Sequence, residues 1–227
     1  KFSSQNAGQI FCTVQSWATH ISKYLPYDYF DLIVLDECHH AAASSYQEIL
    51  QFYYQAIEEG KTDLLGLSAT PFRADGKDIR GDFGGDFTHE LSLAEAIEHG
   101  HIVPFTYFGV KDDVDYSDVR WGQGEKEQLE QILHQNGKHL ENVYQTTISH
   151  VADLTNLRAV GFCAGLKHAR AASEYFNAKG IKALVLSGES TQQEREKAME
   201  SISQMNPELH VIFTADLFNE GVDIPSV

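Results

Sequence analysis

The sequence predicts an α/β fold in which parallel sheets are covered by helices. Short apolar runs alternate along the chain with longer segments whose apolar residues recur every three or four positions. The short runs are almost continuously apolar, which is typical of strands that are buried on both faces. Strands that are joined through helices pair in parallel, so the alternation indicates parallel sheets.

The six apolar runs are interpreted as buried strands, and each is bounded by polar or glycine-containing segments. They cover residues 8–14, 30–36, 63–69, 157–163, 182–188 and 209–215. Apolar residues at helical spacing occupy the segments between them. These predicted helices cover 42–60, 92–100, 124–154, 166–180 and 190–205, the third being two helices that meet near Gly137.

The alternation of strands and helices is interrupted in the middle of the chain. Residues 73–90 are rich in Gly and Asp and predict a loop, and 102–110 are expected to form a strand or an extended crossover. We therefore place a boundary near residue 104. The predicted domains are 1–104 and 105–227, the second with a helical segment near 124–154.

The charge and cysteine content limit the class of protein. The formal net charge is −16, from 33 acidic residues against 17 Lys and Arg, which does not by itself indicate nucleic-acid binding. Net charge leaves room for a local basic groove, however. The three cysteines are widely spaced and odd in number, so we expect a reduced, cytoplasmic protein without a disulfide framework. No apolar run reaches the ~20 residues of a membrane helix, so no membrane partner is expected.

Two acidic residues, Asp36 and Glu37, directly follow the predicted strand 30–36. In open α/β sheets, ligands bind outside the carboxyl ends of the strands. A carboxylate there can hold Mg²⁺ together with phosphate oxygens, and a second one can polarise a water molecule. The alternative interpretation is a strand end that meets water.

Several motifs carry a resemblance to a known family. "DECHH" (36–40) and "LSATPFR" (67–73) resemble motifs II and III of the superfamily 2 helicases and translocases, in the DExH branch. Other stretches resemble three further motifs of the family, in the expected order. They are "FCTVQSW" (11–17) for motif Ib, "VGFCAGLKHARAASEYF" (160–176) for motif IV and "VIFTADLFNEGVDIP" (211–225) for motif V.

The resemblance implies two RecA-like domains, the first truncated at its N-terminus and the second at its C-terminus. It also implies ATP and Mg²⁺ as cofactors and nucleic acid as partner. Asp36 would hold Mg²⁺, Glu37 would orient the hydrolytic water, and His39 would link the nucleotide site to motif III. The other implied site residues fall into three groups, which are Ser68, Ala69 and Thr70 for coupling, Thr13, Gln15, Phe162 and Thr214 for nucleic acid, and Glu220, Gly221 and Asp223 for the nucleotide or the interdomain cleft.

Two further groups of residues could be interpreted as phosphate-binding. Lys167, His168 and Arg170 open the predicted helix 166–180 and would either contact phosphate or form a solvated face. Gly60-Lys61-Thr62 imitates the end of a phosphate-binding loop, but it follows a helix rather than a strand, so Gly60 is interpreted as a helix C-terminus.

The function implied by the resemblance is the core of an ATP-dependent DNA or RNA helicase or translocase. The sequences of these motifs resemble those of bacterial DNA-repair and restriction motors, which favours DNA over RNA as the partner. The family's motifs I and VI, with the phosphate-binding loop and the arginine finger, have no match in these residues, so we expect the chain alone to hydrolyse ATP poorly. The alternative is a non-catalytic, helicase-like scaffold for partner proteins.

Overall fold

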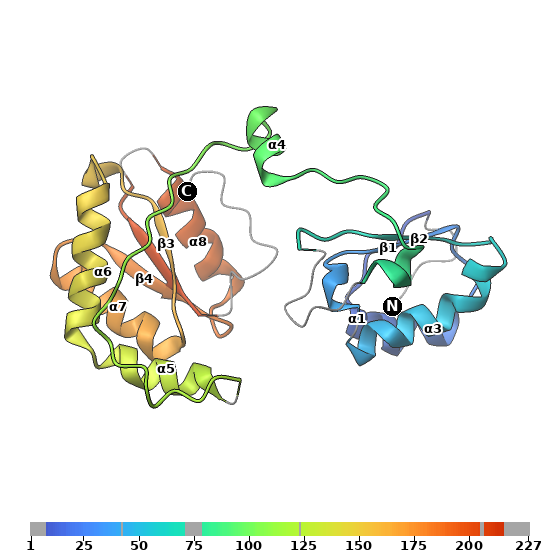
Figure 1. The fold of residues 1–227 in the computed structure, drawn as a ribbon, viewed down its shortest axis with the longest axis horizontal. Helices are drawn as coiled ribbons and strands as arrows, with labels where there is room; N and C mark the ends of the chain where they lie inside the picture. The colour runs from blue at the N-terminus through green and yellow to red at the C-terminus, as the bar shows by residue number, and fades with distance from the viewer. Residues whose placement is uncertain (1–7, 42, 71–78, 123, 205–206, 216–227) are drawn as a thin grey trace. The chain divides into compact units, whose positions relative to one another are not determined.

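The computed structural model describes residues 8–41, 43–70, 79–122, 124–204 and 207–215. The chain divides into two compact units, residues 1–105 and 106–227. Each unit is an arrangement of parallel strands and helices, as the sequence predicts (Figure 1).

The first unit contains a pair of parallel strands joined through a helix. Strands β1 (Leu32–Leu35) and β2 (Asp63–Gly66) pair in register from Leu32–Asp63 to Leu35–Gly66. Between them in the sequence lies α3 (Ser44–Glu58). Gly60 follows α3 with a φ of 66°, as expected at a helix C-terminus rather than in a phosphate-binding loop.

One face of the β1–β2 pair packs on an apolar core. Leu35 of β1 lies with Ile49 and Tyr53 of α3 and with Trp17 from the preceding segment. The indole N–H of Trp17 donates a hydrogen bond of 3.0 Å to the Tyr53 hydroxyl oxygen. This satisfies a polar group that burial would otherwise leave unpaired.

The predicted strand at 8–14 is wrong. Residues 14–24 are helical, as α1 (Val14–Ser16), the π-helical η1 (Trp17–Ile21) and α2 (Ser22–Tyr24). Thr13 caps this segment, since its Oγ1 accepts the Ser16 N–H at 3.2 Å. No strand in the described part of the chain pairs with residues 8–13, and Phe11 is 92% exposed.

The second unit contains a three-stranded parallel sheet in the order β3–β5–β4. Its strands are β3 (Ala159–Phe162), β4 (Ala183–Leu186) and β5 (Val211–Thr214). Helices α5 (Glu125–His134), α6 (Gly137–His150), α7 (Leu166–Ala178) and α8 (Gln192–Ser203) complete the unit. The predicted meeting of two helices near Gly137 is confirmed.

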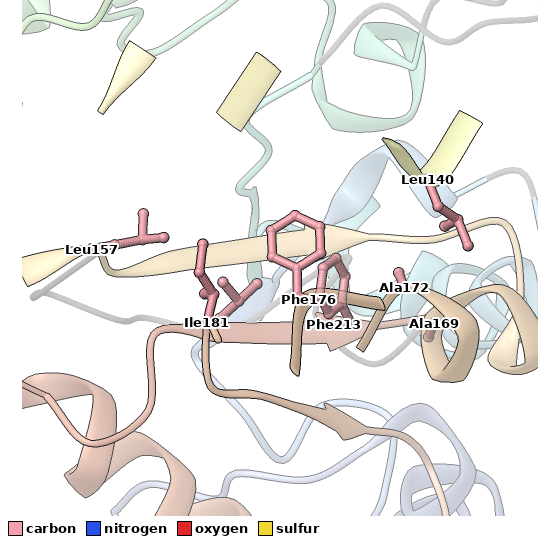
Figure 2. Packing of buried hydrophobic residues seen from close by; sticks show 8 residues of the cluster. Leu140, Leu157, Ala169, Ala172, Phe176, Ile181 and Phe213 are labelled. Carbon is pink, nitrogen blue, oxygen red and sulfur yellow. The ribbon is translucent and has the colours of Figure 1, made fainter. Parts of the chain in front are cut away.

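The central strand β5 is buried on both faces. Val211 and Phe213 pack with residues of α6 and α7, whereas Ile212 packs with residues of α8. All four residues of β5 are buried, which explains why this run is apolar without alternation. Figure 2 shows Phe213 beside Phe176 of α7 within the larger cluster, and their ring centroids are 5.1 Å apart.

The segment between the two sheets has less regular structure. It includes the 3₁₀ helix η3 (Arg80–Phe83) and the short helix α4 (Leu93–Glu98), which begins with a capping box between Ser92 and Glu95. Residues 102–110 form no strand, because no described strand pairs with them. The 3₁₀ turn η4 (Leu154–Asn156) precedes β3. No helix in the described ranges is long and apolar enough to cross a membrane.

Gly161 of β3 provides the first test of this packing. Gly161 pairs in register with Phe213, and a Cβ at Gly161 would lie 2.4 Å from the Phe213 ring. We expect Gly161→Ala to lower the free energy of unfolding by about 1–3 kcal/mol, because the ring must move within a packed core.

Gly188 is the matched control in the same unit, since a Cβ there would meet nothing within 4 Å. Chemical denaturation of the chain and its two variants measures the difference. Equal stability of Gly161→Ala and Gly188→Ala would contradict the packing described for β3 and β5.

Candidate functional site

The turn after β1 carries the acidic pair and has an unusual backbone. Glu37 lies in the left-handed region, with a φ of 50°, and is the only residue other than glycine in the described part of the chain with a positive φ. Such a conformation costs about 1 kcal/mol for a residue with a Cβ, and it is typical of functional sites. The Asp36 carboxylate steadies the turn, since its Oδ1 accepts the Glu37 N–H at 3.0 Å.

Cys38 attaches this turn to the neighbouring strand. It begins the 3₁₀ helix η2 (Cys38–His40), and its N–H donates to the carbonyl oxygen of Leu67, just beyond β2, at 2.9 Å. The side chain is only 4% exposed. Burial raises the pKa of the Cys38 thiol, which therefore stays neutral and acts as a packing group.

His39 joins the two turns that follow β1 and β2. Its Nδ1 lies 3.1 Å from Ser68 Oγ and 3.2 Å from Glu37 Oε2. An ionised carboxylate only accepts hydrogen bonds, so we assign the ring proton to Nδ1. Ser68 Oγ also accepts the Thr70 N–H at 3.1 Å, and a continuous path of contacts therefore runs from Glu37 to Thr70.

Asp36 fits the role of a single protein ligand for Mg²⁺. Its side chain is exposed at the carboxyl edge of the β1–β2 pair. Within the described ranges, no group of three or more His, Cys, Asp or Glu side chains is arranged to hold a metal ion. Mg²⁺ commonly takes one or two carboxylates and completes its shell with water and phosphate oxygens, so a lone carboxylate oxygen suits that ion better than zinc.

The other predicted residues of the first unit lie at its surface. Ala69 is exposed between Ser68 and Thr70. Thr13 caps α1, and Gln15 is exposed in the first turn of that helix. These positions leave Thr13 and Gln15 accessible to a partner, and Thr13 has a structural role as well.

The second unit places Phe162 and Thr214 at the carboxyl ends of neighbouring strands, but with opposite exposure. Phe162 is 63% exposed, whereas the Thr214 side chain is completely buried. The Thr214 Oγ1 has no hydrogen-bond partner among the described residues. Exposure therefore favours a contact with a partner molecule for Phe162 but not for Thr214. The predicted residues Glu220, Gly221 and Asp223 lie outside the described residues.

At the start of α7 the His168 side chain is buried, whereas Lys167 and Arg170 are exposed, as a solvated face would have them. His168 is 7% exposed, its Nδ1 accepts the Ala164 N–H at 3.3 Å, and its ring lies 5.3 Å from that of His139 on α6. The N-terminus of α7 already receives an anionic group, since the Lys167 N–H donates to Glu130 Oε1 of α5 at 2.6 Å. The helical period places His168 on the same side as Ala172 and Phe176, and this signal could have indicated its burial.

Cys38 and Gly66 are the residues of this site that sequence reasoning missed. In the sequence, Cys38 reads as a filler between Glu37 and His39, and Gly66 as one position of an apolar run. The structure brings them together, because a Cβ at Gly66 would lie 2.8 Å from Cys38 Sγ. Two isolated positions that are far apart in the sequence carry no local pattern that predicts such a contact.

Comparisons with known proteins match both units. A family model described as "Type III restriction enzyme, res subunit" matches residues 1–73, and one described as "Helicase conserved C-terminal domain" matches residues 138–227. Together the two models match more than half of the chain.

Individual relatives are similar over different lengths. A Schizosaccharomyces pombe protein that carries the name of a mitochondrial ATP-dependent helicase is 26% identical over 215 residues, which cover 90% of this chain and 33% of that protein. The type I restriction enzyme EcoAI endonuclease subunit of Escherichia coli is 37% identical over 101 residues, covering 43% of this chain and 12% of that subunit. The chain thus spans about a third of the length of the S. pombe relative.

A solved structure supports the fold. A fragment assigned as the HsdR subunit of a type I restriction enzyme from Vibrio vulnificus matches with a TM-score of 0.62 and 19% identity, covering 92% of this chain and 38% of that chain. At this identity, the likeness concerns the fold alone.

The buried His168 predicts a pH dependence of stability. Burial, and to a lesser degree His139, lowers the pKa of His168 from 6.5 to about 4. The unfolded state therefore binds more protons between these values, so the stabilisation is present above pH 6.5 and is lost as the pH falls towards 4. We expect this group to reduce the free energy of unfolding by roughly 2–3 kcal/mol across that window.

The variant His168→Asn isolates this contribution, because its Oδ1 can still accept the Ala164 N–H but does not titrate. Denaturation at pH values from 4 to 7 measures the slope, and the exposed His99 provides the control variant His99→Asn. An unchanged slope in His168→Asn would show that His168 titrates normally.

Proposed function

This chain belongs to the superfamily 2 helicases and translocases, and we propose that it forms the central part of an ATP-dependent motor that moves along or remodels nucleic acid. In this proposal, residues 1–104 are the C-terminal part of one RecA-like domain and residues 105–227 are the N-terminal and central part of a second. The chain would work within a longer protein whose other segments supply a phosphate-binding loop and an arginine finger.

The path of contacts from Glu37 through His39 to Ser68 carries this proposal. It joins the acidic pair to the Ser-Ala-Thr segment through one imidazole, with Nδ1 at 3.1 Å from Ser68 Oγ. A change in the position of Glu37 would therefore change the hydrogen bonding of Ser68 and, through it, of the Thr70 N–H. Such an arrangement suits a site whose occupancy is relayed to another surface.

Each residue of the turn after β1 would have a distinct role in ATP hydrolysis. Asp36 would bind Mg²⁺, which supplies charge neutralisation on the phosphates when it is bound. Glu37 would accept a hydrogen bond from the attacking water and orient it, while His39 holds the carboxylate in place at 3.2 Å. Ser68, Ala69 and Thr70 would pass the change to the nucleic-acid surface.

Nucleic acid is the proposed partner, with DNA favoured over RNA. The exposed Phe162 offers a face for base stacking, and the exposed Gln15 and the Thr13 hydroxyl offer polar contacts. The similarity to restriction-enzyme subunits supports the choice of DNA. The three free cysteines support a reducing, cytoplasmic setting.

The nucleotide-binding residues outside the described part of the chain complete this proposal. Glu220, Gly221 and Asp223 belong to the stretch that resembles motif V, and we propose that they face the nucleotide or the interdomain cleft. Thr214 precedes them, and burial of its hydroxyl argues against a direct contact with nucleic acid.

Glu37→Gln tests the catalytic role. In a longer protein that contains this chain and a phosphate-binding loop, we expect nucleic-acid-stimulated ATP hydrolysis to fall by ~100-fold or more, because an amide cannot polarise water as a carboxylate does. ATP affinity, measured by equilibrium binding, should change little.

Glu48→Gln is the matched control, since it makes the same change at an exposed residue of α3. ATPase activity of Glu37→Gln equal to that of the control would refute the assignment. If even the unaltered longer protein binds ATP without hydrolysing it, the scaffold interpretation is favoured instead.

A further inference from the structure

Cys38 and Gly66 are neighbours in space, and each is close in the sequence to one member of the His39–Ser68 pair. Cys38 precedes His39, and Gly66 stands two residues before Ser68. Gly66 ends β2, and its place opposite Leu35 of β1 is fixed by the strand register. A change in the distance between Cys38 and Gly66 should therefore also change the distance between His39 and Ser68.

Gly66 is required for space. A Cβ there would lie 2.8 Å from Cys38 Sγ, and 2.8 and 2.9 Å from two atoms of the Phe83 ring. Contacts below 3.0 Å force a neighbour to move. Cys38 is held in this position by its own hydrogen bond to Leu67, so the thiol fills the gap that the glycine leaves.

Phe83 closes the same gap from η3. Its partly buried ring packs with the core of the first unit, which also includes Cys38 and Leu35. The gap at Gly66 is thus filled from two directions, by a thiol from the turn after β1 and by an aromatic ring from η3.

We propose that Cys38 and Gly66 act together as positioning residues, a matched pair whose combined volume sets the distance between His39 and Ser68. The functional importance of that distance rests on the function proposed above. Neither residue touches the nucleotide or the nucleic acid in this proposal. They act through His39.

The experiment moves volume from one side of the gap to the other. Gly66→Ala adds a methyl group, which should push the turn after β1 away from β2. Cys38→Ala removes the thiol, which should let that turn move closer to β2. The double variant combines the two changes. The readout is the imidazole ¹⁵N spectrum of His39 in the 227-residue chain, because the Nδ1 shift reports hydrogen bonding to Ser68 and Glu37. Gly81→Ala is the control, since a Cβ there meets nothing within 4 Å.

We expect each single variant to shift the His39 Nδ1 signal, the double variant to return it towards the original position, and the control to leave it unchanged. An unchanged signal in a folded Cys38→Ala or Gly66→Ala chain would overturn the proposal, as would a double variant that departs further than either single one. If Gly66→Ala does not fold, Cys38→Ala still decides, because it must shift the His39 signal by itself, while the methyl group that Gly66→Ala adds would still meet the Phe83 ring in the double variant.

This test is independent of ATP hydrolysis. If the His39 signal responds as expected while Glu37→Gln keeps full ATPase activity, the positioning role stands and the proposed function fails. If Glu37→Gln abolishes activity while the His39 signal is insensitive to both volume changes, the proposed function stands and the positioning role fails.

Discussion

The hydrogen bond from the Cys38 N–H to the Leu67 carbonyl is the contact on which the candidate site depends. It is 2.9 Å long and fastens the turn after β1 to the chain that leaves β2. Glu37 adopts a left-handed conformation in this turn, Cys38 bonds to Leu67 just beyond β2, and His39 reaches Ser68. Two motifs about thirty residues apart in the sequence therefore become one connected set of polar groups.

The second unit is organised around a different constraint, which is burial of β5 on both faces. Packing towards α6 and α7 on one side and α8 on the other requires apolar residues at successive positions, and Gly161 makes room for the Phe213 ring. Phe162 lies at the carboxyl end of β3, beside this buried strand, and is exposed. Both units thus use a strand end to present the residues that we assign to function.

Much of the fold could be predicted from periodicity, but contacts between distant positions could not. The helices α3, α7 and α8 and strands β1 to β5 follow from apolar spacing that is local in sequence. The run 8–14 has the composition of a strand, yet it lacks a pairing partner among the described residues, and the Thr13 cap favours a helix instead. The roles of Cys38 and Gly66 depend on one tertiary contact, and the left-handed Glu37 has no glycine to signal it.

We propose that His39 and Ser68 act as one unit between the acidic turn and the surface assigned above to nucleic acid. A double-mutant cycle on nucleic-acid-stimulated ATP hydrolysis, with His39→Ala, Ser68→Ala and the double variant in the longer protein, tests it most directly. The account predicts that either single change removes most of the stimulation and that the double variant is little worse than the more impaired single one. Effects that multiply in the double variant would show that the two residues act independently and would contradict the account.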